Sequence, residues 1–104
     1  MFTFVETLLF TRLVGKYLLD EEYASLQLAL VENPEEGNVI PGSGGVRKLR
    51  WAIRGRGKRG GVRVIYFARV RHDEIWMLTI YGKNVADNIP AHILRKIRKE
   101  IEDE

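Results

Sequence analysis

Residues 46–81 read VRKLRWAIRGRGKRGGVRVIYFARVRHDEIWMLTIY, and their pattern decides the fold. From Val46 to Ile53, apolar and basic side chains alternate, as expected for a strand with one buried and one basic face. Segments 62–70 and 75–81 are rich in β-branched and aromatic residues, and residues 71–74 fit the hairpin turn between them. The stretch therefore predicts a three-stranded antiparallel meander.

The residues before this meander predict a short strand and two helices. Residues 2–5 have the composition of an opening strand. Thr7 is a suitable N-cap for a helix that runs to about Tyr17. Asp20 is the expected N-cap of a second helix, because acidic residues follow it, and the Asn33–Pro34 pair ends that helix.

The remaining segments complete an α+β domain. The stretches NPEEGN at 33–38 and PGSGG at 41–45 are rich in glycine and proline, so we expect irregular structure there. A last amphipathic helix begins at about Pro90. We predict one domain, residues 1–104, with a small, mostly antiparallel sheet of four strands. Two N-terminal helices and one C-terminal helix flank that sheet.

The composition excludes several classes of protein. The chain has 104 residues and no cysteine, which removes disulfides, thiolate chemistry and cysteine zinc sites. Two isolated histidines, His72 and His92, make no metal site, so we expect neither a metal nor a cofactor. The N-terminus lacks the basic region of a signal peptide, and no apolar run approaches the ~20 residues of a membrane span. We therefore expect a cytoplasmic protein without a membrane partner.

Basic residues are concentrated in the middle of the chain. From Gly37 to His72 there are ten lysines and arginines and no acidic residue, whereas the rest of the chain has seven basic and fourteen acidic residues. Such a concentration attracts polyanions, because each neutralised phosphate releases condensed counterions. Nucleic acid is the expected partner.

The segment 55–60 contains the pattern G-x-G-x-x-G of dinucleotide-binding sites. That pattern requires a strand before it and a helix after it, but here a second strand follows. We interpret the segment as a basic loop that closes around a phosphate backbone. The residues expected to contact RNA or the ribosome are Arg47, Arg54, Arg56, Lys58 and Arg59.

Five blocks of sequence together resemble a known family. They are DEEY at 20–23, NP at 33–34, PGSGGVRKLRW at 41–51, GRGKRGGVRVIYF at 55–67 and LTIYGKN at 78–84. In order and spacing they resemble the RelE/HigB-type toxins of bacterial type II toxin–antitoxin pairs, and the HigB-like branch most. The resemblance spans nearly the whole chain. It implies a RelE-like fold, ribosome-dependent cleavage of mRNA without a metal, inhibition of translation, and silencing by a HigA-like antitoxin.

The resemblance also implies a catalytic cluster made of cations and one phenol. Arg63 is the expected phosphate clamp, because a guanidinium can bind two phosphoryl oxygens at once. Lys83 or Lys48 is a candidate general base if neighbouring cations lower its pKa. Tyr81 is a candidate for stacking on a base or passing a proton, and Arg50 shares the strand face of Lys48. Antiparallel pairing of the second and third meander strands would bring Arg63 near Tyr81 and Lys83. Some relatives carry a histidine at the position of Lys83, which leaves the identity of the base open.

Two other functions fit the same sequence. A nucleic-acid-binding module without catalysis has the same distribution of charge. A toxin of the same fold that acts on DNA gyrase, as ParE-type toxins do, is the third hypothesis, although those toxins generally lack a full set of basic catalytic residues. Loss of RNA cleavage in an Arg63→Ala variant would separate the first hypothesis from these two.

Overall fold

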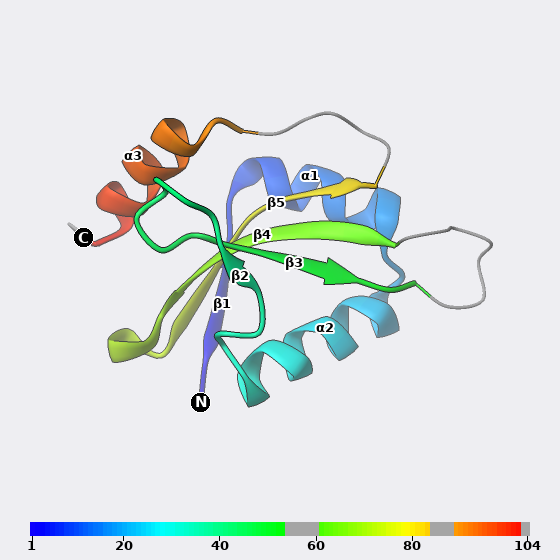
Figure 1. The fold of residues 1–104 in the computed structure, drawn as a ribbon. Coiled ribbons are helices and arrows are strands. Elements are labelled where there is room, and N and C mark those ends of the chain that lie inside the picture. The colour runs from blue at the N-terminus through cyan, green and yellow to red at the C-terminus, as the bar shows by residue number, and fades with distance from the viewer. Residues whose placement is uncertain (54–60, 84–88, 103–104) are drawn as a thin grey trace.

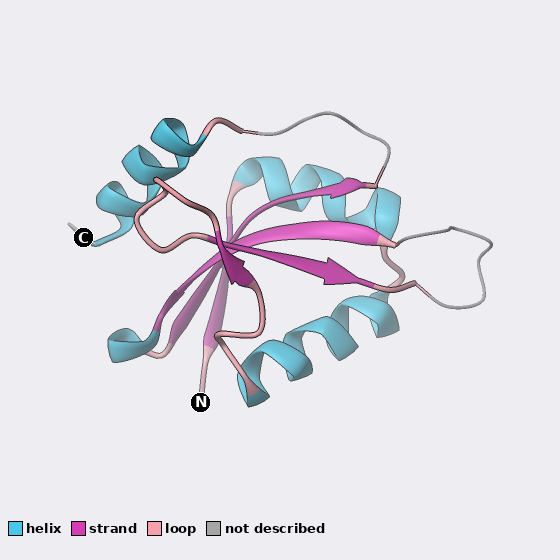
Figure 2. Ribbon diagram, viewed as in Figure 1, coloured by secondary structure: helices cyan, strands magenta, loops and turns pink. Residues whose placement is uncertain are grey.

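Figure 1 shows the fold in a computed structural model, which describes residues 1–53, 61–83 and 89–102. These residues form one five-stranded sheet in the order β1-β5-β4-β3-β2, with three helices packed on it (Figure 2). The α+β class is confirmed, although the sheet has one strand more than the sequence predicts. The elements are β1 (Thr3–Glu6), α1 (Leu8–Tyr17), α2 (Asp20–Glu32), β2 (Asn38–Val39), β3 (Arg47–Trp51), β4 (Val62–Arg69), β5 (Glu74–Gly82) and α3 (Ala91–Glu102).

The predicted meander forms the centre of the sheet. Strands β3, β4 and β5 pair antiparallel in sequence order. A 3₁₀ turn, Val70–His72, joins β4 to β5, and Asp73 after it adopts a left-handed conformation with φ 52°. Strand β1 pairs with β5 in the parallel direction at one edge, so the sheet is mixed. The centre of the sheet thus agrees with the sequence pattern, and its edges come from longer-range pairing.

The additional strand is β2, which begins in a segment that the sequence predicts to be irregular. Asn38 pairs with Lys48 and Val39 pairs with Arg47, both antiparallel. The prediction is wrong for Asn38, and Val39 lies between the two stretches predicted to be irregular. The pairing of both residues is fixed by tertiary contacts rather than by local propensity. The N–H of Gly37 donates to the hydroxyl of Tyr66 at 2.9 Å and so holds the chain beside β3.

The helix starts agree with the capping pattern to within one residue. The Thr7 hydroxyl accepts from the N–H of Phe10 at 3.0 Å, as an N-cap does, so the predicted cap of α1 is confirmed. Asp20 is the first residue of α2 rather than its cap, and Leu19 takes the cap position. There the Glu22 carboxylate accepts from the N–H of Leu19 at 2.7 Å. A side chain within the helix thus satisfies the backbone of the cap, which explains why an apolar residue is tolerated there.

Two apolar clusters lie on opposite faces of the sheet. Helices α1 and α2 cover one face, and α3 covers part of the other, as Figure 1 shows. No helix among the described residues has the length and apolar character needed to cross a bilayer. The first cluster includes Phe10, Leu26, Leu30, Leu49, Val64, Tyr66 and Met77, and the second includes Val46, Ile65, Phe67, Leu78, Tyr81, Leu94 and Ile101.

Candidate nucleic-acid interface

Strand β3 divides its apolar and basic side chains between the two faces of the sheet. Leu49 is buried in the cluster under α1 and α2, whereas Lys48 is half-buried and Arg50 is exposed. Successive side chains of a strand point to opposite faces, so Lys48 and Arg50 lie on the α3 side. Lys48 and Leu94 of α3 line the same cavity, in agreement with this placement. The predicted two-sided strand is confirmed.

One cross-strand row carries three of the predicted site residues. Arg50 lies opposite Arg63 in the β3–β4 pair, and Arg63 lies opposite Tyr81 in the β4–β5 pair. Residues directly opposite in antiparallel strands point to the same face, with Cβ atoms about 4.5–5.5 Å apart. This Arg50–Arg63–Tyr81 row therefore places two arginines and a tyrosine side by side on one face of the sheet. The proximity of Arg63 and Tyr81 predicted from strand pairing is confirmed.

Arg50 and Arg63 place two positive charges directly opposite each other on neighbouring strands. Like charges directly opposite each other on neighbouring strands are destabilising, by a few tenths of a kcal/mol up to about 1 kcal/mol. An anion bound between the guanidinium groups relieves this repulsion, and each guanidinium can bind two phosphoryl oxygens. The pairing of Arg50 with Arg63 therefore suits a site for a phosphate group.

Tyr81 and Lys83, the two predicted groups at the end of the last strand, differ in exposure. Tyr81 is 7% exposed and belongs to the apolar cluster under α3, so its ring is part of the core. Lys83 is exposed and follows Gly82, which lies opposite Val62 at the start of β4. Lys83 therefore stands at the same end of the sheet as Arg63. Among the described residues, Lys83 has no pairing partner in the β4–β5 register, so it is near the row but is not part of it.

Gly61 controls how the chain enters β4. It has a φ of +62°, and a Cβ at this position would overlap the carbonyl oxygen of Trp51. Only glycine combines this conformation with such a close approach to the end of β3. Because Arg63 follows two residues later, Gly61 helps to set Arg63 opposite Arg50. A glycine between a basic segment and the start of a strand, as here, is a feature of the sequence that can indicate such a close approach of the backbone.

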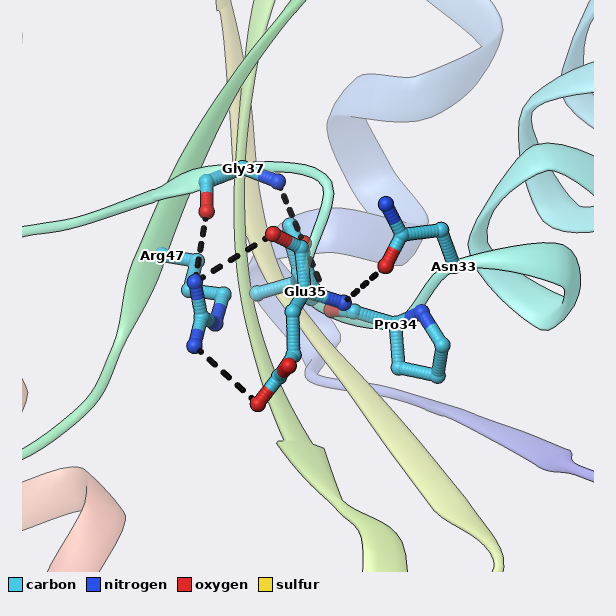
Figure 3. Close-up of polar contacts among 6 residues, drawn as sticks. Asn33, Pro34, Glu35, Gly37 and Arg47 are labelled. Atoms are coloured by element: carbon cyan, nitrogen blue, oxygen red, sulfur yellow. Dashed lines mark hydrogen bonds and ion pairs between the residues drawn. The ribbon is translucent and has the colours of Figure 1, made fainter.

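Arg47 lies on β3 but has a different environment from Lys48 and Arg50. Its guanidinium donates to the carbonyl oxygens of Gly37 at 2.8 Å and Glu35 at 3.3 Å, and it approaches the Glu35 carboxylate at 3.6 Å (Figure 3). These contacts join β3 to the loop that follows α2. They favour a structural role for Arg47 over the predicted contact with RNA.

Tyr66 completes this connection from inside the core. Its hydroxyl donates to the carbonyl oxygen of Pro34 at 2.8 Å and accepts from the N–H of Gly37 at 2.9 Å. Burial is the main cause that raises the pKa of the Tyr66 phenol above its ordinary value of 10.0. The loop that leads to β2 is thus held by Tyr66 and Arg47 together, which keeps Gly37 against Lys48 of β3.

Two cavities border the basic face. One, of about 320 Å³, lies beside the edge of β3 and is lined by residues that include Glu36, Asn38, Lys48 and Arg50. The other, of about 260 Å³, lies between the sheet and the start of α3, beside Tyr81 and Lys48. Sequence reasoning missed the residues that α3 and the β2 segment contribute to the second cavity, since the pattern gives no register between those elements.

Four of the predicted RNA contacts, Arg54, Arg56, Lys58 and Arg59, lie outside the described residues. Within the described part of the chain, no group of three or more histidine, aspartate or glutamate side chains could hold a metal ion. The predicted catalytic groups on this face are cations and a phenol, and the Glu36 carboxylate lines the cavity beside Lys48 and Arg50. They can bind a phosphate, stabilise added negative charge and transfer a proton.

No model of a known protein family matches this chain.

Proposed function

We propose that this protein is a ribosome-dependent endoribonuclease that cleaves translated mRNA as the toxin of a type II toxin–antitoxin pair. The observation that carries the proposal is the Arg50–Arg63–Tyr81 row, with Lys48 on the same face. This arrangement fits the catalytic cluster that the resemblance to RelE/HigB-type toxins implies. The five-stranded sheet with α1 and α2 on one face and α3 on the other supports a RelE-like fold.

The proposed reaction needs only the groups on this face. The 2′-oxygen of one nucleotide forms a bond to the adjacent phosphorus, and the bond from phosphorus to the 5′-oxygen breaks. The products are a 2′,3′-cyclic phosphate and a free 5′-hydroxyl. Arg63 and Arg50 bind the phosphoryl oxygens as negative charge increases in the transition state. Lys48 or Lys83 accepts the proton of the 2′-hydroxyl, and Tyr81 or a neighbouring cation donates one to the leaving oxygen.

Dependence on the ribosome follows from the kinds of groups in this proposed site. The row contains neither a histidine nor a carboxylate, the usual general bases near neutral pH. A site without a well-matched general base gains most from a substrate that is already aligned for in-line attack, since alignment can supply a large part of the rate enhancement. The ribosome holds mRNA in a fixed conformation. A HigA-like antitoxin is the proposed inhibitor, and translating ribosomes in the cytoplasm are the proposed place of action.

The test is induced expression of three proteins with mapping of transcript 5′ ends. Wild type is expected to stop growth and to create new ends inside translated regions. Arg63→Ala is expected to lower cleavage by about 10²–10³-fold or more, the usual loss when one donor to a developing oxyanion is removed. Arg12→Ala, which removes an exposed arginine from α1 on the other side of the sheet, should cleave like wild type.

The other outcomes favour the two other functions. Growth arrest without new transcript ends, together with a DNA-damage response, would point to gyrase as the target. Binding of RNA that Arg63→Ala weakens, with no cleavage by any variant, would identify a nucleic-acid-binding module. Thermal unfolding of Arg63→Ala must match wild type for the comparison to hold.

A further inference from the structure

The cavity between the sheet and α3 has properties that the phosphate chemistry above does not use. Its volume is about 260 Å³, just below the roughly 300–1,000 Å³ of pockets that hold drug-sized ligands. A single ring system is therefore the size of group that fits. Its walls come from three distant parts of the chain, which meet only in the folded protein. Apolar side chains of Ile40, Ile65, Ile89 and Leu94 line it, together with Lys48 and Tyr81.

The position of this cavity connects it to the arginine row. Tyr81 belongs both to the row and to the cavity wall, and Lys48 precedes Arg50 by two residues on the same strand face. A phosphate held by Arg50 and Arg63 would therefore lie on the same face of the sheet as the cavity, beside Lys48 and Tyr81 of its wall. In an RNA strand each phosphate joins two nucleosides, so one base beside that phosphate is within reach of the cavity.

The lining of the cavity matches the chemistry of an unpaired base. Aliphatic side chains pack against the two flat faces of an aromatic ring, and polar groups at the rim bind its edge. The Lys48 amino group can donate hydrogen bonds, and a base presents acceptors such as ring nitrogens and carbonyl oxygens. A phosphate or a free sugar has no apolar surface to gain from these walls.

We propose that this cavity binds one unpaired nucleobase of the RNA, next to the phosphate that the Arg50–Arg63–Tyr81 row holds. The inference rests on the proposed function and adds to it the part of the substrate that sets cleavage position. Arg50 and Arg63 then give affinity for any RNA, whereas binding in the cavity depends on the presence and the identity of a base. Cleavage sites are expected to share a base preference at one position beside the cut.

The first experiment measures binding without cleavage. The full chain is titrated with the four nucleoside 5′-monophosphates and, separately, with ribose 5-phosphate, while backbone amide signals are followed by NMR. Nucleotides should shift the signals of Ile40, Ala91 and Leu94, and ribose 5-phosphate should shift only signals near Arg63. If ribose 5-phosphate shifts the cavity signals as strongly as the nucleotides do, the cavity does not bind a base and the proposal is overturned.

A variant that fills the cavity provides the second measurement. Ala91 lines the cavity at the first turn of α3, so Ala91→Leu places added carbon atoms into the space for the base. Nucleotide affinity should fall by about tenfold or more, in the range measured when stacking of a single base is lost. Affinity for ribose 5-phosphate should not change. Ala24→Leu, at an exposed position of α2, is the matched control and should bind nucleotides like wild type.

A second variant covers the case in which Ala91→Leu does not fold. Ile40→Ala removes one wall of the cavity from the segment after β2 and should also weaken nucleotide binding while leaving binding of ribose 5-phosphate unchanged. If the folded variant binds nucleotides as tightly as wild type does, a base in this cavity is ruled out.

Cleavage mapping separates this inference from the proposed function. If wild type cuts translated transcripts and a folded cavity variant cuts them with the same base preference, the endoribonuclease function stands and the base site fails. If wild type binds nucleotides through the cavity but never cuts RNA, the base site stands and the proposed catalysis fails.

Discussion

The two faces of the same sheet differ in how completely they are covered. On one face, α1 and α2 bury a continuous cluster that includes Phe10, Leu26 and Leu30, each 0% exposed. On the other face, α3 covers the apolar cluster around Phe67, and basic side chains such as Arg50 occupy uncovered sheet. The first face is covered by helices and buries its apolar side chains. The second face is buried only where α3 packs on it.

This difference shows how a small domain can keep a functional surface without losing its stability. The alternating side chains of β3 contribute to both faces, because Leu49 is buried on one face and Arg50 is exposed on the other. The free energy of folding comes mainly from the covered face, since apolar burial is the largest favourable term. Repulsion between Arg50 and Arg63 is small beside it and can be tolerated. Substitutions on the two faces should therefore change different properties.

The largest effect on stability is expected on the covered face. Phe10→Ala removes a fully buried ring from α1 and should lower the free energy of unfolding by about 3–5 kcal/mol. Leu9→Ala removes a neighbouring side chain that is 46% exposed and should change it much less. Chemical denaturation of both variants measures the difference. Equal losses would mean that the burial of Phe10 does not dominate this face.

A smaller loss is expected at the connection between the core and β2. Tyr66→Phe keeps the ring but leaves the buried N–H of Gly37 without the hydroxyl that accepts from it. An unsatisfied buried donor costs about 1–3 kcal/mol of stability. Hydrogen exchange locates the effect: the Gly37 amide should exchange faster, while the Ile40 amide, which donates to Val46 at 2.8 Å, should change less. A uniform increase in exchange would show a global rather than a local loss.

Arg47 and Arg50 form a matched pair for comparing the faces. Arg47→Ala removes the bonds to Gly37 and Glu35 and should cost roughly 1–2 kcal/mol, with little effect on RNA affinity. Arg50→Ala should leave stability within about 0.5 kcal/mol, because its side chain is exposed. It should reduce the slope of log affinity against log salt by about one. Binding of a short RNA over a range of salt concentrations, together with denaturation, tests both statements. If Arg47→Ala weakened RNA binding and Arg50→Ala lowered stability, the structural role would belong to Arg50 and the RNA contact to Arg47.

The sequence predicts the elements with strong local patterns well. The alternation around Leu49 predicts β3 and its two faces, and Thr7 predicts the start of α1. Features that depend on contacts between distant parts of the chain are not predicted in this way. The two residues of β2 pair because Tyr66 and Arg47 hold the preceding loop, and these contacts are invisible in a local pattern.

The same reasoning applies to the candidate site. Antiparallel pairing of β4 with β5 predicts that Arg63 approaches Tyr81. Their exact opposition depends on a register shift between Ile65 and Tyr66, which a local pattern does not predict. Arg47 looks like its basic neighbours in the sequence, and only its contact with the Gly37 carbonyl sets it apart. The cavity beside Tyr81 needs the position of α3, which helical periodicity does not provide.

The last predicted effect is a loss of stability at alkaline pH that originates on the covered face. The Tyr23 hydroxyl donates to the Glu6 carboxylate at 2.7 Å, and burial, followed by this hydrogen bond, raises the pKa of Tyr23 above its ordinary value of 10.0. The folded protein therefore retains this proton at a pH where the unfolded chain releases it. The stabilisation is complete below about pH 10 and is lost as the pH rises above that value. Tyr66, whose pKa burial also raises, contributes in the same direction.

Denaturation at several values from roughly pH 9 to 11 measures this loss. One such tyrosine can contribute at most about 1.4 kcal/mol per pH unit to the slope, so Tyr23→Phe should give a shallower dependence than wild type. It should also be less stable at neutral pH by about 1 kcal/mol, because the bond to Glu6 is gone. An unchanged slope would mean that Tyr23 titrates alike in the folded and unfolded chains. The bond to Glu6 would then stabilise the junction of β1 and α2 without coupling it to pH.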